Sequence, residues 1–255
     1  MTTRRQFIGG AVVLAGGYSA LRYGGPALRD LLTPLPEAQA LDAPAGFRAL
    51  PLSSVSQGLD PLVGLEPAQV LEVAPDQLDG RLCEALFGLD RVPDGVVPIA
   101  SFSDYACPFC RVLTPRLNAL EAASGGALRV KWHELPILGP ASTDGARAAL
   151  AAAQQGRYAE THARLIRAAF QPTEAYLRAL SQDLNLDAER LLTDMQSPAI
   201  DAALTDSRAL AQLFGMVGTP ALVVGRTLVQ GEISARNLDR LIAVERAAGP
   251  PPGCA

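Results

Sequence analysis

Two cysteines near the middle of the chain have the spacing and surroundings needed for thiol chemistry. They are the outer residues of Cys107-Pro108-Phe109-Cys110, which follows an apolar, β-prone stretch and opens a helical one. The first turn of a helix has unpaired N–H groups, and together with the helix dipole these favour an anion. We therefore expect Cys107 to be a thiolate nucleophile. Cys110, one turn inside the helix, is expected to be a shielded thiol that resolves mixed disulfides.

The same pair could instead hold a metal ion or form a purely structural bridge. Zinc usually takes four ligands, and the only histidines, His133 and His162, lack the spacing of a zinc site. A bridge across two residues closes a very small loop and therefore stabilises a fold little. We expect neither a metal ion nor a tightly bound cofactor.

A second signal is Val217-Gly218-Thr219-Pro220, just before a short apolar segment. A proline at the start of a strand is unusual because it removes a hydrogen-bond donor from the ladder. It could be an ordinary turn proline. Alternatively, a cis Thr219–Pro220 bond would present the backbone of Thr219 to an extended substrate peptide. Its place after the dicysteine motif and before a final hairpin and helix favours the cis bond.

The elements that must position these residues follow a clear order along the chain. Hydrophobic periodicity predicts strand, helix, strand, a block of four or five helices, two short strands and a last amphipathic helix. That order indicates an α/β fold with a mixed sheet covered by helices. The predicted ranges are 96–102, 108–123, 127–135, 142–214, 221–224, 227–230 and 234–247, and the last helix has Ile233, Leu238, Leu241, Ile242 and Val244 as its apolar set.

The first forty residues have the pattern of an export signal. Arg4 and Arg5 precede an uncharged, glycine-rich run over residues 6–21, which is similar to a twin-arginine signal. A helix of this length spans roughly 24 Å, which is short for a bilayer core of about 30 Å. Cleavage and retention as a membrane anchor stay equally open, and a buried N-terminal helix is the less favoured alternative.

Residues 41–93 are rich in Pro, Gly, Ser and Asp. We predict an irregular arm there, with one short helix near residues 79–89, packed on the main domain. Cys83 in this arm could pair with Cys254 at the C-terminus, but two unrelated thiols are the preferred interpretation.

Overall composition excludes several classes of protein. Of the 255 residues, 49 % are hydrophobic and 19 % charged, so a substantial core can form and disorder is excluded. The net charge is -4, and no basic stripe suited to nucleic acid occurs. We therefore expect no nucleic-acid partner.

The residues around both motifs resemble the DsbA-like branch of the thioredoxin superfamily over residues 96–244. The matching segments are Phe-Ser-Asp-Tyr-Ala-Cys-Pro-Phe-Cys at 102–110, Leu-Pro-Ile-Leu-Gly at 135–139 and Gly-Met-Val-Gly-Thr-Pro-Ala at 215–221. The resemblance implies a thioredoxin-like fold over 94–250, with an inserted helical domain at about 142–214. It also implies that Cys107 is the nucleophile and Cys110 the resolving thiol. Pro220 would be the cis proline, with Thr219, Pro108 and Phe109 as substrate-binding residues.

The chain departs from this family pattern at two positions. Many relatives have an acid where this chain has Ser101, and a buried acid would help to move the proton of the inner thiol. Lys131 could support that step, although a solvated strand lysine is the preferred interpretation, and Glu134 is a weaker candidate. Strongly oxidising relatives often have a histidine at the position of Phe109. Phenylalanine cannot donate to the thiolate, which predicts a weaker oxidant.

Together these features predict an exported thiol:disulfide oxidoreductase in the periplasm. Its expected partners are unfolded or partly folded exported proteins and a membrane redox partner, with possible anchoring through residues 6–21. Oxidation of dithiols is the leading prediction. The alternatives are an extracytoplasmic reductase fed by a membrane electron donor, and a non-catalytic peptide-binding module of the same fold.

Overall fold

The computed structural model describes residues 34–58, 80–167 and 171–255. The expected export signal covers residues 1–40; its apolar run at 6–21 lies outside the described residues, whereas residues 34–40 are described, and part of the expected arm also lies outside them. Among the helices of the described ranges, none is long and apolar enough to span a membrane.

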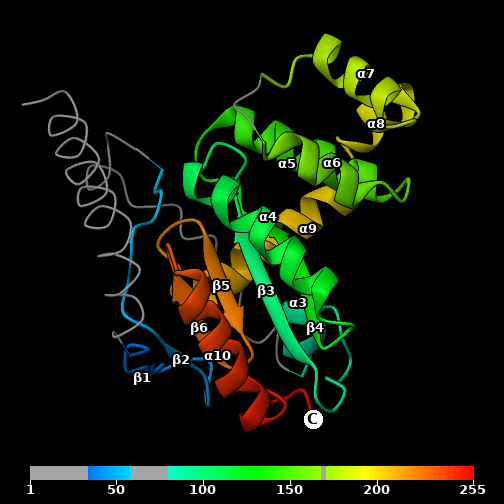
Figure 1. Cartoon of the computed structure of the whole chain (residues 1–255). Helices are drawn as coiled ribbons and strands as arrows, with labels where there is room; N and C mark the ends of the chain where they lie inside the picture. Colours follow the sequence, from blue (N-terminus) through cyan, green and yellow to red (C-terminus); the bar gives the residue numbers. More distant parts are fainter. Residues whose placement is uncertain (1–33, 59–79, 168–170) are drawn as a thin grey trace, which may run out of the picture.

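A six-stranded mixed sheet forms the centre of the molecule (Figure 1). Its strand order is β1-β2-β6-β5-β3-β4, and the central strand β3 pairs in parallel with β4 and antiparallel with β5. All seven residues of β3 are buried, because helices cover both faces of the sheet. The mixed sheet predicted from the element order is confirmed. The strands are β1 Gln39–Ala40, β2 Arg48–Ala49, β3 Val97–Ser103, β4 Leu128–Glu134, β5 Ala221–Val224 and β6 Thr227–Gln230.

Two pairs of helices cover the two faces of the sheet. One core lies between the sheet and helices α4 (Pro108–Ala123) and α10 (Ala235–Ala248). The other lies between the sheet and helices α3 (Leu82–Phe87) and α9 (Pro198–Leu213). Val244 was predicted to belong to the apolar set of the last helix. It is 44 % exposed and therefore lies outside the core.

Four further helices form a separate layer beyond one end of the sheet, at the top of Figure 1. They have their own apolar core and stand between β4 and α9, where the inserted helical segment was predicted. The last helix of that predicted segment, α9, spans both regions, because its C-terminal half packs on the sheet. The inserted helices are α5 Pro140–Ala153, α6 Tyr158–Leu165, α7 Glu174–Asp183 and α8 Ala188–Asp194.

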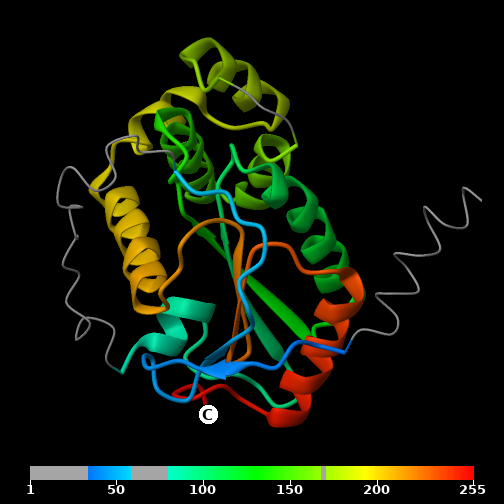
Figure 2. The same ribbon diagram turned by 90° about the vertical axis from the view of Figure 1, so that its left-hand side faces the viewer.

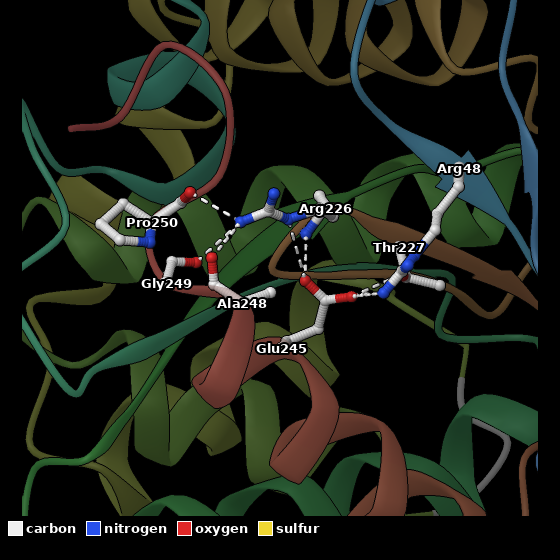
Figure 3. A network of polar contacts seen from close by, with 7 residues as sticks. All are labelled: Arg48, Arg226, Thr227, Glu245, Ala248, Gly249 and Pro250. Atoms are coloured by element: carbon white, nitrogen blue, oxygen red, sulfur yellow. Dashed lines mark hydrogen bonds and ion pairs between the residues drawn. The ribbon is translucent and has the colours of Figure 1, made fainter.

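Two short strands before residue 50 extend the sheet. β2 lies in the predicted arm, which is therefore less irregular than predicted, and β1 lies at the end of the segment predicted as an export signal. β1 begins at Gln39, and β2 pairs in parallel with β6. Figure 3 shows why β2 is held there: the buried carboxylate of Glu245 on α10 accepts hydrogen bonds from Arg48 at 2.7 Å and from Thr227 at 2.6 Å. Its second oxygen accepts the backbone N–H of Arg226 at 3.0 Å. Such short strands carry no periodic signal, so only these tertiary contacts define them.

The preferred interpretation of Cys83 and Cys254 as unrelated thiols is wrong. The two cysteines form a disulfide that links α3 to the C-terminal tail, and both are buried in the same core. A backbone hydrogen bond also holds the tail nearby: the N–H of Val92, after α3, donates to the carbonyl of Cys254 at 2.8 Å.

Candidate active site

The dicysteine motif joins the end of β3 to the start of α4, as predicted. Cys107 is the N-cap residue of α4, and Pro108 occupies its first turn, where the missing N–H is harmless. The Cys107 sulfur accepts the backbone N–H of Cys110 at 3.2 Å. Both cysteines are free thiols in this structure. The local sequence therefore builds the N-terminal anion site that was expected for the nucleophile.

The environment of Cys107 favours its ionised form. A hydrogen bond from the Cys110 thiol is the main reason that the pKa of Cys107 falls to about 6, from an ordinary value of 9.0. Burial opposes this shift, whereas hydrogen bonds from Ser56 and Thr219 add to it. At neutral pH, Cys107 is therefore mostly a thiolate.

Cys110 has the opposite character. Burial raises the pKa of its thiol far above the ordinary value, and the neighbouring Cys107 raises it further. Its side chain is almost inaccessible to solvent. One cysteine of the pair is thus an activated nucleophile, while the other keeps its proton until the nucleophile has reacted.

The second motif lies directly against the nucleophile. The Thr219–Pro220 peptide bond is cis, as predicted, and the Thr219 carbonyl lies 3.4 Å from the Cys107 sulfur. Pro220 and Phe109 line one small hollow, together with Ile233. Val112 and Val217 are 59 % and 49 % exposed, which leaves apolar surface on α4 and on the loop before the cis proline. The arrangement suits an extended, partly apolar peptide held beside a reactive sulfur.

Asp104 is a structural anchor of the site that the sequence analysis did not identify. Its buried carboxylate accepts four hydrogen bonds, from the backbone N–H groups of Ala106, Ile137 and Leu138 and from the Ser142 hydroxyl, at 2.6–2.9 Å. These bonds tie the cysteine loop to the segment after β4 and to the first inserted helix. The only sequence signal was an aspartate three residues before a nucleophile, which by itself does not reveal its partners.

A buried polar cluster lies behind the cysteine loop. The Glu134 carboxylate accepts hydrogen bonds from the hydroxyls of Tyr105 and Tyr158, both at 2.7 Å. His162 Nδ1 lies 2.8 Å from the Tyr105 hydroxyl. Burial, followed by the charge of Glu134, raises the pKa of both tyrosines. Glu134, the weaker candidate for a supporting acid, is therefore joined to the active-site loop through Tyr105.

The other candidates for support stand further from the sulfurs. Ser101 is buried within β3. The side chain of Lys131 lies beside Gly88, at the end of α3. The largest influences on the pKa of the two thiols come from burial and from hydrogen bonds and charge within the cysteine and cis-proline loops. The structure thus brings together both cysteines, Pro108, Phe109, Thr219 and Pro220, and leaves Lys131 outside this group.

Known proteins similar to this chain point to one family. The model of the DSBA-like thioredoxin domain matches residues 98–243. A thioredoxin-like oxidoreductase from Silicibacter pomeroyi DSS-3 is 35 % identical, with a TM-score of 0.58, over 64 % of this chain and 97 % of that one. The thiol-disulfide exchange protein alpha-DsbA2 from Wolbachia pipientis shares the fold, at 21 % identity and a TM-score of 0.57, over 70 % of this chain and 99 % of that one.

Curated relatives show that such a segment also occurs within larger proteins. A Na(+)/H(+) antiporter NhaA 1 from Mycolicibacterium gilvum is 27 % identical over 165 residues, which are 60 % of this chain and 25 % of the antiporter. The NhaA antiporter of Herminiimonas arsenicoxydans is also 27 % identical, over 60 % of this chain and 24 % of its own length. The chain thus spans about a quarter of the length of these relatives. The family match, the fold and the paired cysteines beside a cis proline agree: the chain belongs to the family of the DSBA-like thioredoxin domain.

Proposed function

We propose that the chain is an exported dithiol oxidase, which transfers its Cys107–Cys110 disulfide to proteins as they fold. The observation that carries this proposal is the contrast between the two thiols. The pKa of Cys107 is lowered to about 6, whereas burial raises that of Cys110. A stabilised thiolate favours the reduced form of the pair, which makes its disulfide a better oxidant.

The reaction takes two thiol–disulfide exchanges. A substrate thiolate attacks the Cys107 sulfur of the enzyme disulfide, so that a substrate–Cys107 bond forms and the Cys107–Cys110 bond breaks. Cys110 leaves with the electron pair and takes up a proton, because its buried site does not stabilise a charge. A second substrate thiolate then attacks the substrate sulfur of the mixed disulfide. Cys107 leaves as a thiolate, the substrate has lost two electrons, and the enzyme pair has gained them.

Peptide binding supports the same proposal. The Thr219 backbone, Pro220, Pro108 and Phe109 border the sulfur, and extended, partly apolar segments are exposed only in unfolded or partly folded proteins. These are the substrates we propose. A membrane redox partner that takes the two electrons away would complete the cycle.

The proposed location is the periplasm. The paired arginines Arg4 and Arg5, with the uncharged run behind them, support export by residues 1–40, either as a cleaved signal or as an anchor through residues 6–21. The Cys83–Cys254 disulfide also supports an oxidising compartment. Expression of the full chain and of a chain that starts at residue 41 tests this. We expect the structural disulfide to form in cells only from the full chain; equal oxidation of both would contradict export by this segment.

A reductase fed by a membrane electron donor is the second candidate, because Phe109 gives the Cys107 thiolate no hydrogen bond from its side chain. A non-catalytic peptide-binding module would show affinity without turnover, and would keep that affinity after Cys107→Ala.

The equilibrium potential of the Cys107–Cys110 pair separates these candidates. It is measured by alkylation and mass spectrometry after equilibration in glutathione buffers. A value near about −120 mV supports a dithiol oxidase, and one near about −270 mV identifies a thioredoxin-like reductase. In cells, thiol trapping should find the pair oxidised; a reduced pair would favour the reductase.

A further inference from the structure

The N-terminal arm runs along the peptide side of the active site after it leaves β2. Figure 2 shows this segment, blue to cyan, rising alongside the β5–β6 hairpin. The backbone N–H of Ser53 donates to the carbonyl of Gln230 at 3.0 Å, and the N–H of Glu232 donates to the carbonyl of Ser54 at 3.2 Å. Residues 53–54 therefore continue the edge of the sheet towards the cis proline.

The next residues pair with the backbone directly before the cis proline. The N–H of Ser56 donates to the carbonyl of Thr219 at 2.7 Å, and the N–H of Thr219 donates to the carbonyl of Ser56 at 2.9 Å. This two-way antiparallel bridge occupies both backbone polar groups of Thr219. They are the groups that would hold an extended substrate, and here a segment of the same chain holds them.

Two glycines make room for this close approach. A Cβ atom at Gly218 would stand 2.6 Å from the carbonyl oxygen of Ser56 and 3.0 Å from the Val55 side chain. A Cβ atom at Gly58 would stand 2.4 Å from the carbonyl oxygen of Ile137, in the loop after β4. Neither glycine has a positive φ, so the backbone conformation does not require glycine at these positions. The lack of space for a side chain does. The arm therefore crosses the site from the cis-proline loop to the loop after β4.

The crossing segment also covers the nucleophile. Cys107 has no exposed surface, and its sulfur lies 3.4 Å from the Thr219 carbonyl, the same carbonyl that accepts the backbone N–H of Ser56. A substrate sulfur must approach this atom to react. Because Ser56 is paired with Thr219 next to this sulfur, we expect the arm to move before exchange can begin.

We propose that residues 53–56 are an internal pseudosubstrate, in which Ser56 stands where the cysteine of an extended substrate peptide binds beside Cys107. This proposal rests on the proposed function, since it assigns the occupant and the register of the same peptide site. Serine has an oxygen where cysteine has a sulfur. It can therefore take the position of the substrate residue without forming a disulfide.

The two ends of this segment are held with different strength. Its base at β2 is fixed by the buried Glu245 carboxylate, which binds Arg48 (Figure 3). Its tip is held by four backbone hydrogen bonds, and Leu52 between base and tip is 58 % exposed. The tip can lift while the base stays in place. Only an unpaired strand can replace its backbone bonds, and the apparent affinity of any substrate falls with the fraction of molecules in which the tip is closed.

A cross-linking experiment tests the register. Ser56→Cys in a Cys110→Ala background is incubated with oxidised glutathione, and disulfides are mapped by non-reducing peptide mass spectrometry. The Cys107 thiolate attacks the glutathione disulfide and releases one glutathione thiolate. The new thiolate at position 56 then attacks the Cys107 sulfur and releases the second. One glutathione disulfide is reduced to two thiols as the internal disulfide forms.

Ser54→Cys in the same background is the matched control, because it places the same thiol on the same segment two residues away. We expect the internal disulfide with position 56 and only a glutathione adduct with position 54. Equal cross-linking from both positions would mean that neither residue of the arm is held specifically beside Cys107. No cross-link from position 56 would mean that the tip does not lie next to Cys107. Either result overturns the proposal.

A second pair of variants tests whether the tip controls access. Ser56→Pro removes the N–H that donates to Thr219, whereas Ser56→Ala keeps both backbone bonds and loses only the hydroxyl. The rate of Cys107 alkylation is measured at about pH 8, where the thiol is ionised in both variants. We expect Ser56→Pro to react about two- to tenfold faster than Ser56→Ala, since one hydrogen bond changes the open fraction by that factor. Equal rates would overturn the control of access.

Neither measurement depends on turnover, so the two proposals fail separately. In one outcome, the position-56 cross-link forms and Ser56→Pro opens the site, but neither Ser56→Pro nor the wild type oxidises a reduced dithiol peptide. The pseudosubstrate proposal is then supported and the oxidase proposal is contradicted. In the other outcome, Ser56→Pro and the wild type oxidise the peptide at the same rate and are alkylated at the same rate. The oxidase proposal is then supported and the pseudosubstrate proposal is contradicted.

Discussion

The chain contains two cysteine pairs that differ in almost every physical respect. Cys83 and Cys254 are joined across 171 residues of sequence and lie inside an apolar core, with no thiol left to react. Cys107 and Cys110 are three positions apart, and the first of them caps a helix beside a cis proline. Reactivity thus depends on the helix N-terminus and the hydrogen bonds around the sulfur, because both pairs are buried.

The sharpest test of this contrast removes one sulfur from each pair. Cys107→Ser should reduce oxidation of a reduced dithiol peptide to the background rate, since no other thiolate can carry the exchange. Cys254→Ser should keep turnover at a temperature where the variant is folded. Turnover that survived Cys107→Ser would show that the nucleophile has been misassigned.

The structural pair should dominate stability. Replacing both Cys83 and Cys254 by serine opens a loop of 171 residues, and loop entropy alone predicts a loss of up to about 5 kcal/mol in the free energy of unfolding. Urea denaturation followed by circular dichroism measures this loss against the wild type. An unchanged urea midpoint would show that the Cys83–Cys254 disulfide does not stabilise the fold.

The active pair should instead show a marked dependence on pH. With a pKa of about 6 in the folded protein and 9.0 as the ordinary value, the Cys107 thiolate stabilises the reduced form fully above about pH 9. This contribution falls as the pH is lowered through 6, and the oxidised form lacks it. Alkylation of reduced wild type should titrate near pH 6. Cys110→Ala removes the main hydrogen bond and should shift that midpoint upward; an unshifted midpoint would assign the low pKa to the remaining donors around the sulfur.

A smaller change should tune the active pair without touching the structural one. Phe109→His adds a donor near the thiolate, and one interaction of about 1.4 kcal/mol raises the potential by roughly 30 mV. Titration in glutathione buffers measures this rise, and the urea midpoint of the oxidised variant serves as the control. A potential that does not rise would refute the explanation that Phe109 weakens the oxidant.

The smallest effect is expected at Lys131, whose side chain lies beside Gly88 at the end of α3. Lys131→Met should leave both the potential and the alkylation midpoint of Cys107 unchanged. A shift in either value would favour the supporting role over the preferred interpretation of Lys131 as a solvated strand lysine.

Elements with strong local signals could be predicted without the structure. The helix at 108–123 and the strands at 221–224 and 227–230 were predicted with the bounds that the structure shows. The nucleophile followed from the same logic, because a cysteine before a proline at a helix start is defined by neighbours in sequence. The cis bond at Pro220 was also predictable, since its place in the order of elements favoured it.

Tertiary structure alone decided the features that join distant parts of the chain. The Cys83–Cys254 bond depends on α3 and the C-terminal tail packing on one face of the sheet, and no pattern within either segment indicates that. The four donors of Asp104 come from residues up to 38 positions away. The arm at residues 53–56 has an ordinary polar sequence, and its position over Cys107 comes from backbone hydrogen bonds, which side-chain patterns do not encode.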